Sequence, residues 1–273
     1  MDLGLRGKRA LVTGASQGIG RAVAESLARE GCDLDLVARD AEALDAVRTA
    51  FTRSHHVDVT VHALDLAVRG TAAMIAERCG VADIVVNNAG NTPRGDILEV
   101  DEDTWRTGWE LKIFGYINMT REFYRRMKVR GTGVIVNVIG IGAEKLEYAY
   151  TAGATGNAAL VAMTRAVGSV SLDYGVRVMG VSPGWVETER AKRSLRKRAA
   201  EALGNAERWP ELVNDWPRGR LIAPQEIADV VTFVASDRAS AMSGHIVTVD
   251  AGFAARGYPH TRSRDAGQAG RQA

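Results

Sequence analysis

The sequence has few cysteines, little net charge and no long apolar run, and each of these features excludes a class of protein. The two cysteines, Cys32 and Cys79, lie at the ends of predicted helices, and no other potential metal ligands stand near them in the sequence. We therefore expect both cysteines to be small buried hydrophobic side chains, and we expect no metal site. A formal charge of +2 argues against a nucleic-acid binder. No apolar run approaches the roughly 20 residues that span a bilayer, and the N-terminus lacks a signal-peptide segment. We therefore expect a cytoplasmic protein.

Short apolar segments alternate with amphipathic segments along a chain of 273 residues, 46% hydrophobic and 25% charged. Strands separated by helices cannot form hairpins, so this order predicts a parallel sheet with right-handed crossovers. We expect an α/β protein with a single-domain, doubly wound Rossmann fold, in which helices cover both faces of a seven-stranded parallel sheet. Strands are expected at 10–12, 34–38, 57–63, 83–87, 134–138, 176–182 and 246–250, and helices at 21–30, 41–53, 67–79, 103–130 and 150–174.

No linker, repeat or change of composition interrupts the chain before its C-terminal end. We therefore predict one Rossmann-type domain over residues 1–255. Residues 256–273 are polar and glycine-rich, with five arginines or aspartates, a composition typical of a disordered tail.

The stretch Thr13–Gly20 contains the spacing Gly-x-x-x-Gly-x-Gly between a short apolar strand and a helix. A glycine turn of this kind exposes backbone N–H groups at a helix N-terminus, where the peptide dipoles favour the negative charge of a pyrophosphate. Glycine is needed because a Cβ would block the ligand or the close approach of helix and strand. The residues predicted to bind the cofactor here are Gly14, Ser16, Gln17, Gly18, Ile19 and Gly20.

Two further motifs, Asn87–Gly90 and Ser182–Gly184, follow this turn in the order and spacing of the short-chain dehydrogenase/reductase family. The sequence resembles that family over nearly all of residues 3–253. The resemblance implies a nicotinamide cofactor and a carbonyl or alcohol substrate. It also implies further cofactor residues: Asp65 and Leu66 beside the adenine, Asn87, Ala89 and Gly90 near its ribose, Asn157 at the nicotinamide ribose, and Pro183, Gly184, Val186 and Thr188 at the nicotinamide carboxamide.

The end of the second predicted strand indicates which nicotinamide cofactor binds. A carboxylate there would accept hydrogen bonds from the adenine ribose and repel a 2′-phosphate. The chain instead has Ala38 where NAD-specific relatives carry Asp, followed by Arg39, whose guanidinium can grip a phosphate. NADP(H) is therefore favoured over NAD(H). The alternative is that Arg39 is a solvated loop charge and that Asp40 only caps the next helix.

The catalytic positions of the family are occupied by other residues in this sequence. The family uses a Tyr as proton donor or acceptor, a Lys that lowers the tyrosine pKa, a Ser that holds the substrate oxygen and an Asn in a proton relay. A phenol ionises near pH 10, so it needs a neighbouring cation to act near neutrality. By alignment, the Tyr, Lys, Ser and Asn positions are held by Gly153, Asn157, Gly140 and Lys112.

Three interpretations of these replacements remain open. In the first, the protein is an oxidoreductase with relocated machinery, in which Lys112 and either Tyr150 or Tyr148 supply the cation and the phenol. In the second, Lys112 is a Schiff-base nucleophile or a general base in a lyase, isomerase or dehydratase. In the third, the protein is a catalytically silent NADP(H) sensor. The alternative without a catalytic role is that the two tyrosines only line the pocket and that Lys112 pairs with Glu110 or a neighbouring carboxylate.

Residues 188–220 occupy the place of the family's substrate lid. The basic residues at 190, 192, 193, 196, 197 and 198 suggest attraction of an anionic substrate, although part of such a run is solvated. Trp209 and Trp216 are expected to close an apolar pocket over the nicotinamide. By resemblance, helices 103–130 and 150–174 pair across a dimer axis in a homodimer or homotetramer. The histidines at 55, 56, 62 and 260 receive no role.

Overall fold

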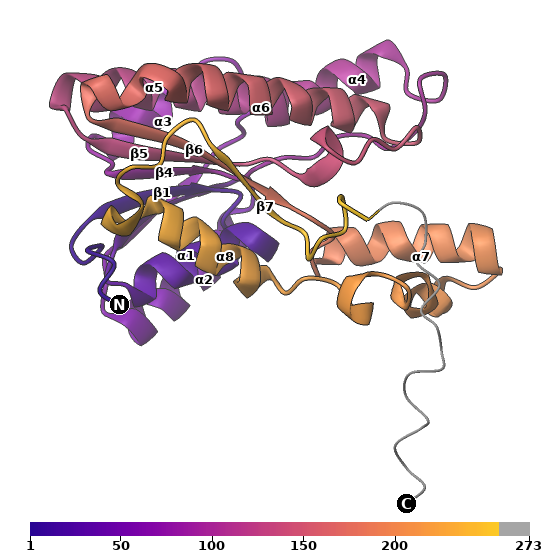
Figure 1. Ribbon diagram of the computed structural model, residues 1–273. Helices are drawn as coiled ribbons and strands as arrows, with labels where there is room; N and C mark the ends of the chain where they lie inside the picture. Colours follow the sequence, from indigo (N-terminus) through magenta and orange to yellow (C-terminus); the bar gives the residue numbers. More distant parts are fainter. Residues whose placement is uncertain (257–273) are drawn as a thin grey trace, which may run out of the picture.

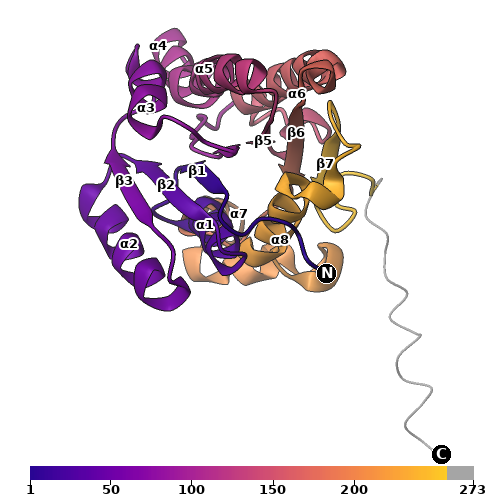
Figure 2. The ribbon, with the colours of Figure 1, turned by 90° about the vertical axis from the view of Figure 1, so that its left-hand side faces the viewer.

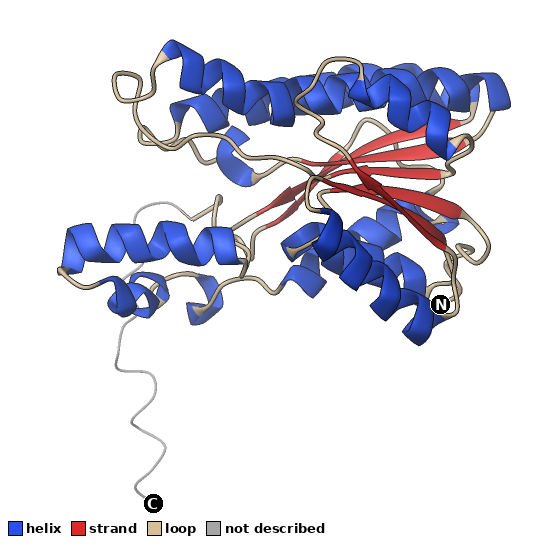
Figure 3. Cartoon of the chain, turned by 180° about the vertical axis from the view of Figure 1, so that it is seen from behind, coloured by secondary structure: helices blue, strands red, loops and turns tan. Residues whose placement is uncertain are grey.

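The computed structural model describes residues 1–256, and these form a parallel sheet between two layers of helices (Figures 1 and 3). The sheet has seven strands in the order β3-β2-β1-β4-β5-β6-β7, and every neighbouring pair is parallel. This confirms the doubly wound Rossmann fold. The strands are β1 (Arg9–Thr13), β2 (Asp33–Ala38), β3 (Val59–Ala63), β4 (Ile84–Asn87), β5 (Gly133–Val138), β6 (Val176–Pro183) and β7 (Ile246–Val249).

Helices cover both faces of the sheet, as the alternating sequence predicts (Figures 1 and 2). One face is covered by α1 (Gly18–Arg29), α2 (Ala41–His55) and α8 (Pro224–Ala235), whose apolar sides pack into the larger core cluster. The other face is covered by α3 (Thr71–Cys79), α5 (Gly115–Arg130) and α6 (Thr151–Ser171). Within the described residues, no helix is long and apolar enough to cross a membrane.

The structure corrects the expected boundaries of several elements. The first helix begins at Gly18, inside the glycine turn, rather than at residue 21. The third begins at Thr71, because the main chain of residues 65–70 forms turns and Gly70 stands before the helix with a left-handed φ of 86°. The helix expected at 103–130 is divided by a π-helical segment, η1 (Glu110–Phe114), between α4 (Glu102–Trp109) and α5.

A helical arm extends from the end of β6 beyond the edge of the sheet (Figure 3). It contains α7 (Glu189–Leu203) and the 3₁₀ segments η4 (Ala206–Val213) and η5 (Pro217–Gly219). Its own small core consists of buried Leu195, Val213 and Leu221, with Trp209 and Trp216 packed against them. The arm therefore stands as a separately packed unit beside the carboxyl end of the sheet.

The two cysteines are buried, as expected, but Cys79 has neighbours that its sequence position did not suggest. The parallel pairing of β2 with β3 brings Asp35 and His62 together, and Cys79 lies beside them. His62 Nε2 lies 2.8 Å from Asp35 Oδ1 and 3.5 Å from Cys79 Sγ. Arg9 donates to the other oxygen of Asp35 at 2.6 Å, so the carboxylate already has a cationic partner. The expectation that Cys79 lacks potential ligand neighbours was wrong.

Candidate active site

The N-terminus of α1 has the features of an anion-binding site. Gly14 and Gly18 have left-handed φ angles of 67° and 57°, which glycine adopts without strain. Gln17 stands at the N-cap without a side-chain hydrogen bond, and the first turn contains no acidic residue. The first N–H groups of the helix therefore have no side-chain cap and face no carboxylate of their own helix. Gly20 packs so closely on Gly14 that a Cβ would overlap its carbonyl. These residues fit a pyrophosphate.

The motif at the end of β4 has a different role for each asparagine. Asn87 is fully buried, and its amide donates to Asn137 Oδ1 at 2.9 Å, so this side chain links β4 to β5. Asn88 donates from Nδ2 to Thr13 O at 3.0 Å and thereby holds the glycine turn against β4. The backbone N–H of Ala89 also bonds to Thr13 Oγ1. Of the predicted cofactor residues in this motif, Gly90 lines the cavity described below.

Arg39 and Asp65 lie just beyond the carboxyl ends of β2 and β3, where the sequence predicts that the adenosine binds. Ala38 ends β2, and the Arg39 guanidinium that follows is 73% exposed and 4.0 Å from Asp65 Oδ2. Asp40 caps α2 by accepting from the N–H of Ala43. Leu66 is buried at 9% exposure. The cap that belongs to the alternative interpretation of this segment is therefore present. Arg39 is exposed at the carboxyl end of β2, where it is open to solvent and to a ligand.

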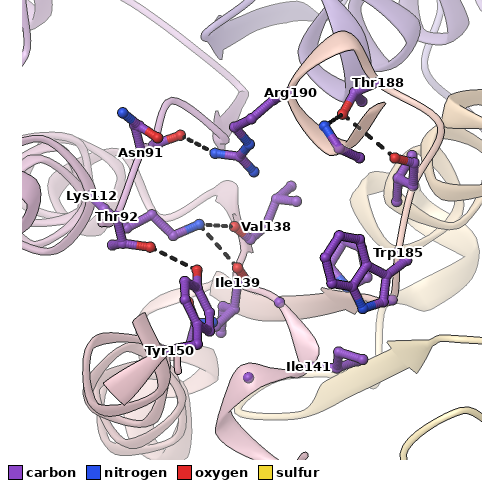
Figure 4. Close-up of a pocket in the computed structure, with 18 of the residues that line it drawn as sticks. Asn91, Thr92, Lys112, Val138, Ile139, Ile141, Tyr150, Trp185, Thr188 and Arg190 are labelled. Carbon is purple, nitrogen blue, oxygen red and sulfur yellow. Dashed lines mark hydrogen bonds between the residues drawn. The ribbon is translucent and has the colours of Figure 1, made fainter. Parts of the chain in front are cut away.

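A cavity of about 430 Å³ opens at the carboxyl ends of β4, β5 and β6 (Figure 4). Ligands of open α/β sheets bind at this edge. The structure brings together here many of the residues that the sequence predicted, from segments far apart in the chain. They are Ile19, Gly90, Lys112, Gly140, Tyr150, Asn157, Pro183, Gly184, Val186 and Thr188.

Lys112 projects from the π-helical segment into this cavity (Figure 4). Its Nζ donates to the main-chain oxygens of Val138 and Ile139, at 2.9 and 3.0 Å, and to the Tyr116 hydroxyl at 3.2 Å. None of these groups is an anion, so the alternative in which Lys112 pairs with a carboxylate was wrong. Burial, assisted by the charge of Arg190, lowers the pKa of Lys112 to about 7. The side chain fits because Gly90 has no Cβ, which would overlap the lysine stem.

Tyr150 occupies the space above Gly153. A Cβ on Gly153 would overlap the Tyr150 ring, so the glycine is what allows the ring to lie there. The Tyr150 hydroxyl lies 2.7 Å from Thr92 Oγ1 at the cavity wall (Figure 4). Tyr148, the other phenol predicted, is 68% exposed and does not line the cavity. The ring of Tyr150 therefore lies directly against Gly153, the position to which the sequence alignment assigns the family's tyrosine.

Asn157 projects from α6 toward the end of β5. It is 3% exposed, and its Nδ2 would lie 3.3 Å from a Cβ on Gly140 and 3.0 Å from one on Gly142. The amide thus fills the space that side chains at these glycines would take. An amide can hydrogen-bond a ribose hydroxyl but carries no charge with which to acidify a phenol.

The arm contributes less charge to the cavity than its sequence suggested. Arg190 lines the cavity and donates to Gly90 O at 2.7 Å. By contrast, Lys192 pairs with Glu187, at 3.1 Å. Arg196 and Lys197 lie near Glu207 and Glu201, respectively, outside the cavity.

Trp185, rather than Trp209 or Trp216, forms the aromatic wall of the cavity. Trp216 packs against Trp185 from behind, with ring centroids 5.3 Å apart, so the expected position of the tryptophans was wrong.

Sequence reasoning missed several residues of the cavity wall, among them Thr92, Arg94, Lys145 and Trp185. A signal existed for some of them. Thr92 and Arg94 follow directly after the Asn87–Gly90 motif, and Trp185 stands between two predicted cofactor residues. Nothing in the local sequence distinguished Lys145 from an ordinary surface lysine.

The fold and the glycine turn define a dinucleotide-binding α/β protein of the doubly wound class. A family model described as Enoyl-(Acyl carrier protein) reductase matches residues 14–254. The chain belongs to this family, within the short-chain dehydrogenases/reductases.

Its relatives are dehydrogenases and reductases. The chain is 34% identical to the galactitol 2-dehydrogenase (L-tagatose-forming) of Cereibacter sphaeroides, over 91% of this chain and 96% of that protein. It is 30% identical to the 3-oxoacyl-acyl-carrier-protein reductase FabG of Vibrio harveyi, over 92% and 98%. The crystal structure of L-sorbose reductase from Gluconobacter frateurii, complexed with NADPH and L-sorbose, superposes with a TM-score of 0.88 at 28% identity, over 94% of this chain and all of that one.

Proposed function

We propose that this protein is an NADP(H)-dependent oxidoreductase that acts on a carbonyl or alcohol substrate through Lys112 and Tyr150. The observation that carries the proposal is the Lys112 amine in the cavity, held by two main-chain oxygens at the end of β5 with a pKa near 7. The relatives named above are dehydrogenases and reductases, which favours redox chemistry. Because the family's catalytic tyrosine and lysine positions hold Gly153 and Asn157, other groups must handle the proton.

The chain's own residues have separate tasks in this proposal. When bound, the nicotinamide supplies or accepts the hydride. Tyr150 donates a proton to the substrate oxygen during reduction, and the Thr92 hydroxyl holds the phenol in place at 2.7 Å. Lys112 supplies a positive field and exchangeable protons in the cavity, because a pKa near 7 allows both of its forms at neutral pH. Asn157 is positioned to hydrogen-bond the nicotinamide ribose.

The preference for NADP(H) rests on the adenine side of the groove. Ala38 offers no carboxylate to accept from a ribose 2′-hydroxyl, and Arg39 is 73% exposed with only a distant contact to Asp65. A guanidinium in this position can bind a 2′-phosphate with paired N–H donors. The structural relative from Gluconobacter frateurii was crystallised with NADPH.

Two features of the whole chain complete the proposal. Residues 188–220 close over the substrate as a lid, since Thr188 and Arg190 at the start of this segment line the cavity. The protein assembles as a homodimer or homotetramer through α5 and α6. The predicted disordered tail, apart from Arg256, lies outside the described residues.

A second candidate function uses the same lysine without redox chemistry. A buried amine that is partly neutral at pH 7 can attack a substrate carbonyl or remove a proton, as a lyase, isomerase or dehydratase requires. The hydrogen bonds from Nζ to three neutral oxygens would have to be partly given up during such an attack. Redox chemistry requires no such rearrangement, and we therefore rank it first.

One experiment separates these functions. The purified protein is titrated with NADPH and NADH, and single-turnover absorbance at the nicotinamide band is then followed with a panel of ketones, aldehydes and diketones. We expect tighter binding of NADPH and its oxidation by at least one carbonyl compound. Lys112→Met should abolish this oxidation and leave NADPH affinity within a few-fold, whereas Lys197→Met, on the outer side of α7, should change neither.

Each other outcome contradicts a stated part of the proposal. Oxidation that survives in Lys112→Met would remove the lysine from the mechanism. Tight binding without oxidation would favour the non-redox enzyme or a silent NADP(H) sensor. Failure of both nucleotides to bind would overturn the cofactor assignment.

A further inference from the structure

Arg94 has an unusual environment at the mouth of the cavity. Its guanidinium carbon lies 4.7 Å from the centroid of the Tyr150 ring and 4.9 Å from that of the Trp185 ring. Both distances are within the range of cation–π contacts, which attract the guanidinium to the rings without using its N–H donors as hydrogen bonds do. In the described part of the chain, its one side-chain hydrogen bond is with Glu147, at 3.4 Å, which is long for a charged pair.

The charges around the cavity are mostly positive. Arg94, Lys112, Lys145 and Arg190 line it, against a single carboxylate from Glu147. The Lys145 ammonium lies 4.9 Å from the Phe253 ring centroid and has no carboxylate within salt-bridge distance among the described residues. Arg190 is committed in part to the main chain of Gly90, on the cofactor side. The positive charge left on the substrate side therefore comes from Arg94 and Lys145, and of these two only Arg94 offers a planar fork of N–H donors.

We propose that Arg94 binds a carboxylate of the substrate, so that the protein acts on a hydroxy acid or the corresponding oxo acid. The inference rests on the proposed function, since it names the substrate of that same site. A guanidinium edge matches the two oxygens of a carboxylate with parallel N–H donors. The rings of Tyr150 and Trp185 fix the orientation of that edge in advance, which lowers the entropy lost on binding.

The position of Arg94 also limits the size of the substrate. The guanidinium lies over the ring of Tyr150, whose hydroxyl is the proposed proton donor. A carboxylate on Arg94 and a carbonyl at that hydroxyl must then be joined by only a few carbon atoms. A cavity of about 430 Å³, which must also hold the nicotinamide end of the cofactor, suits such a small acid.

Binding of malonate, a small carboxylate with no carbonyl to reduce, tests this site without turnover. Calorimetric titration is carried out on the full chain in the presence of saturating NADP⁺, with malonamide as the neutral control. We expect malonate to bind and malonamide not to bind. Arg94→Gln should weaken malonate binding at least tenfold, and Arg94→Lys, which keeps the charge but loses the fork, should weaken it by a smaller factor.

Arg198→Gln is the matched control for loss of an arginine beside Trp185. The Arg198 guanidinium carbon lies 5.7 Å from the same ring, yet the residue does not line the cavity, so malonate affinity should stay within twofold. Unchanged affinity in Arg94→Gln, equal binding of malonamide, or no binding of malonate to the unsubstituted protein would overturn the proposal. Unaltered NADP⁺ affinity and circular dichroism of each variant would show that it is folded.

The kinetic counterpart compares an oxo acid with its amide as substrates for NADPH oxidation. Arg94→Gln should lower kcat/KM for the acid at least a hundredfold, mostly through KM, and lower it for the amide by no more than threefold. An equal loss for both compounds would show that Arg94 only supports Tyr150. Absence of NADPH oxidation with any compound would reject the proposed function, whereas malonate binding that depends on Arg94 would still establish the carboxylate site.

Discussion

At the scale of single residues, three glycines determine the shape of the active site. Gly90 leaves room for the stem of Lys112, Gly153 leaves room for the ring of Tyr150, and Gly140 leaves room for the amide of Asn157. The charged and phenolic groups thus occupy space that would otherwise be taken by side chains at these positions. The shape of the cavity therefore depends on the absence of side chains at these three glycines as well as on the side chains that fill the space.

Gly153→Ala tests this dependence. The added methyl group would overlap the Tyr150 ring and displace its hydroxyl from Thr92, so we expect turnover to fall at least tenfold with NADPH affinity within a few-fold. Gly115→Ala is the control, because the nearest atom to its Cβ would be 3.6 Å away, an ordinary contact. Single-turnover rates of the two variants give the comparison, and normal turnover in Gly153→Ala would exclude Tyr150 in its present position as the proton donor.

At the scale of elements, the π-helical segment Glu110–Phe114 positions Lys112. A π-helical turn inserts one extra residue into a helix and shifts the direction of its side chains, and such turns occur frequently at functional sites. Here the segment divides a helix that the sequence pattern predicted as continuous. It directs the lysine stem along Gly90 toward the end of β5.

The buried amine should make stability depend on pH. Lys112 has a pKa of about 7 in the folded protein, lowered from 10.5, so between these values unfolding takes up a proton. The free energy of unfolding should therefore rise with pH in this range, by up to about 1.4 kcal/mol per pH unit from this residue.

Urea denaturation at pH 8 and 9.5 measures this contribution. Lys112→Met should lose that part of the slope, and Lys197→Met, whose side chain is 81% exposed, should keep it. Identical slopes for the unsubstituted protein and Lys112→Met would mean that the amine is protonated in the folded state throughout this range.

At the scale of the whole molecule, the helices on one face of the sheet present exposed apolar side chains. Val170 at the end of α6 is 51% exposed, and Leu172 and Tyr174 just beyond it are 45% and 40% exposed. Exposed apolar groups that lie together are typical of an interface between protein chains. We propose that these side chains contribute to the predicted pairing of helices 103–130 and 150–174 between subunits.

Light scattering after gel filtration tests this assembly. We expect the mass of a dimer or a tetramer, and Val170→Glu should lower it, because the interface would bury an unpaired carboxylate. Val68→Glu, at an exposed site in the turn before α3, should leave the mass unchanged. A monomeric mass for the unsubstituted protein, or no change in Val170→Glu, would contradict an interface at this position.

The sequence by itself determined the layout of the fold and the cofactor end of the site. Strands and helices that alternate without hairpins allow a parallel, doubly wound sheet, and the glycine turn after β1 belongs to a single continuous segment. Local chemistry also offered the Asp40 cap as an alternative role for that residue, and the resemblance to the family placed Lys112 at the site whose cavity it lines. These features could be predicted because each depends on residues close together in the chain or on a regular pattern.

Only the tertiary structure decided the substrate side. Arg94, Tyr150 and Trp185 come from three separate loops, and no local pattern shows that one guanidinium lies over both rings. The same holds for Asp35, His62 and Cys79, which the register of β2 with β3 and the packing of α3 bring together. Contacts between distant segments depend on how the helices pack on the sheet, and that packing is a property of the whole chain.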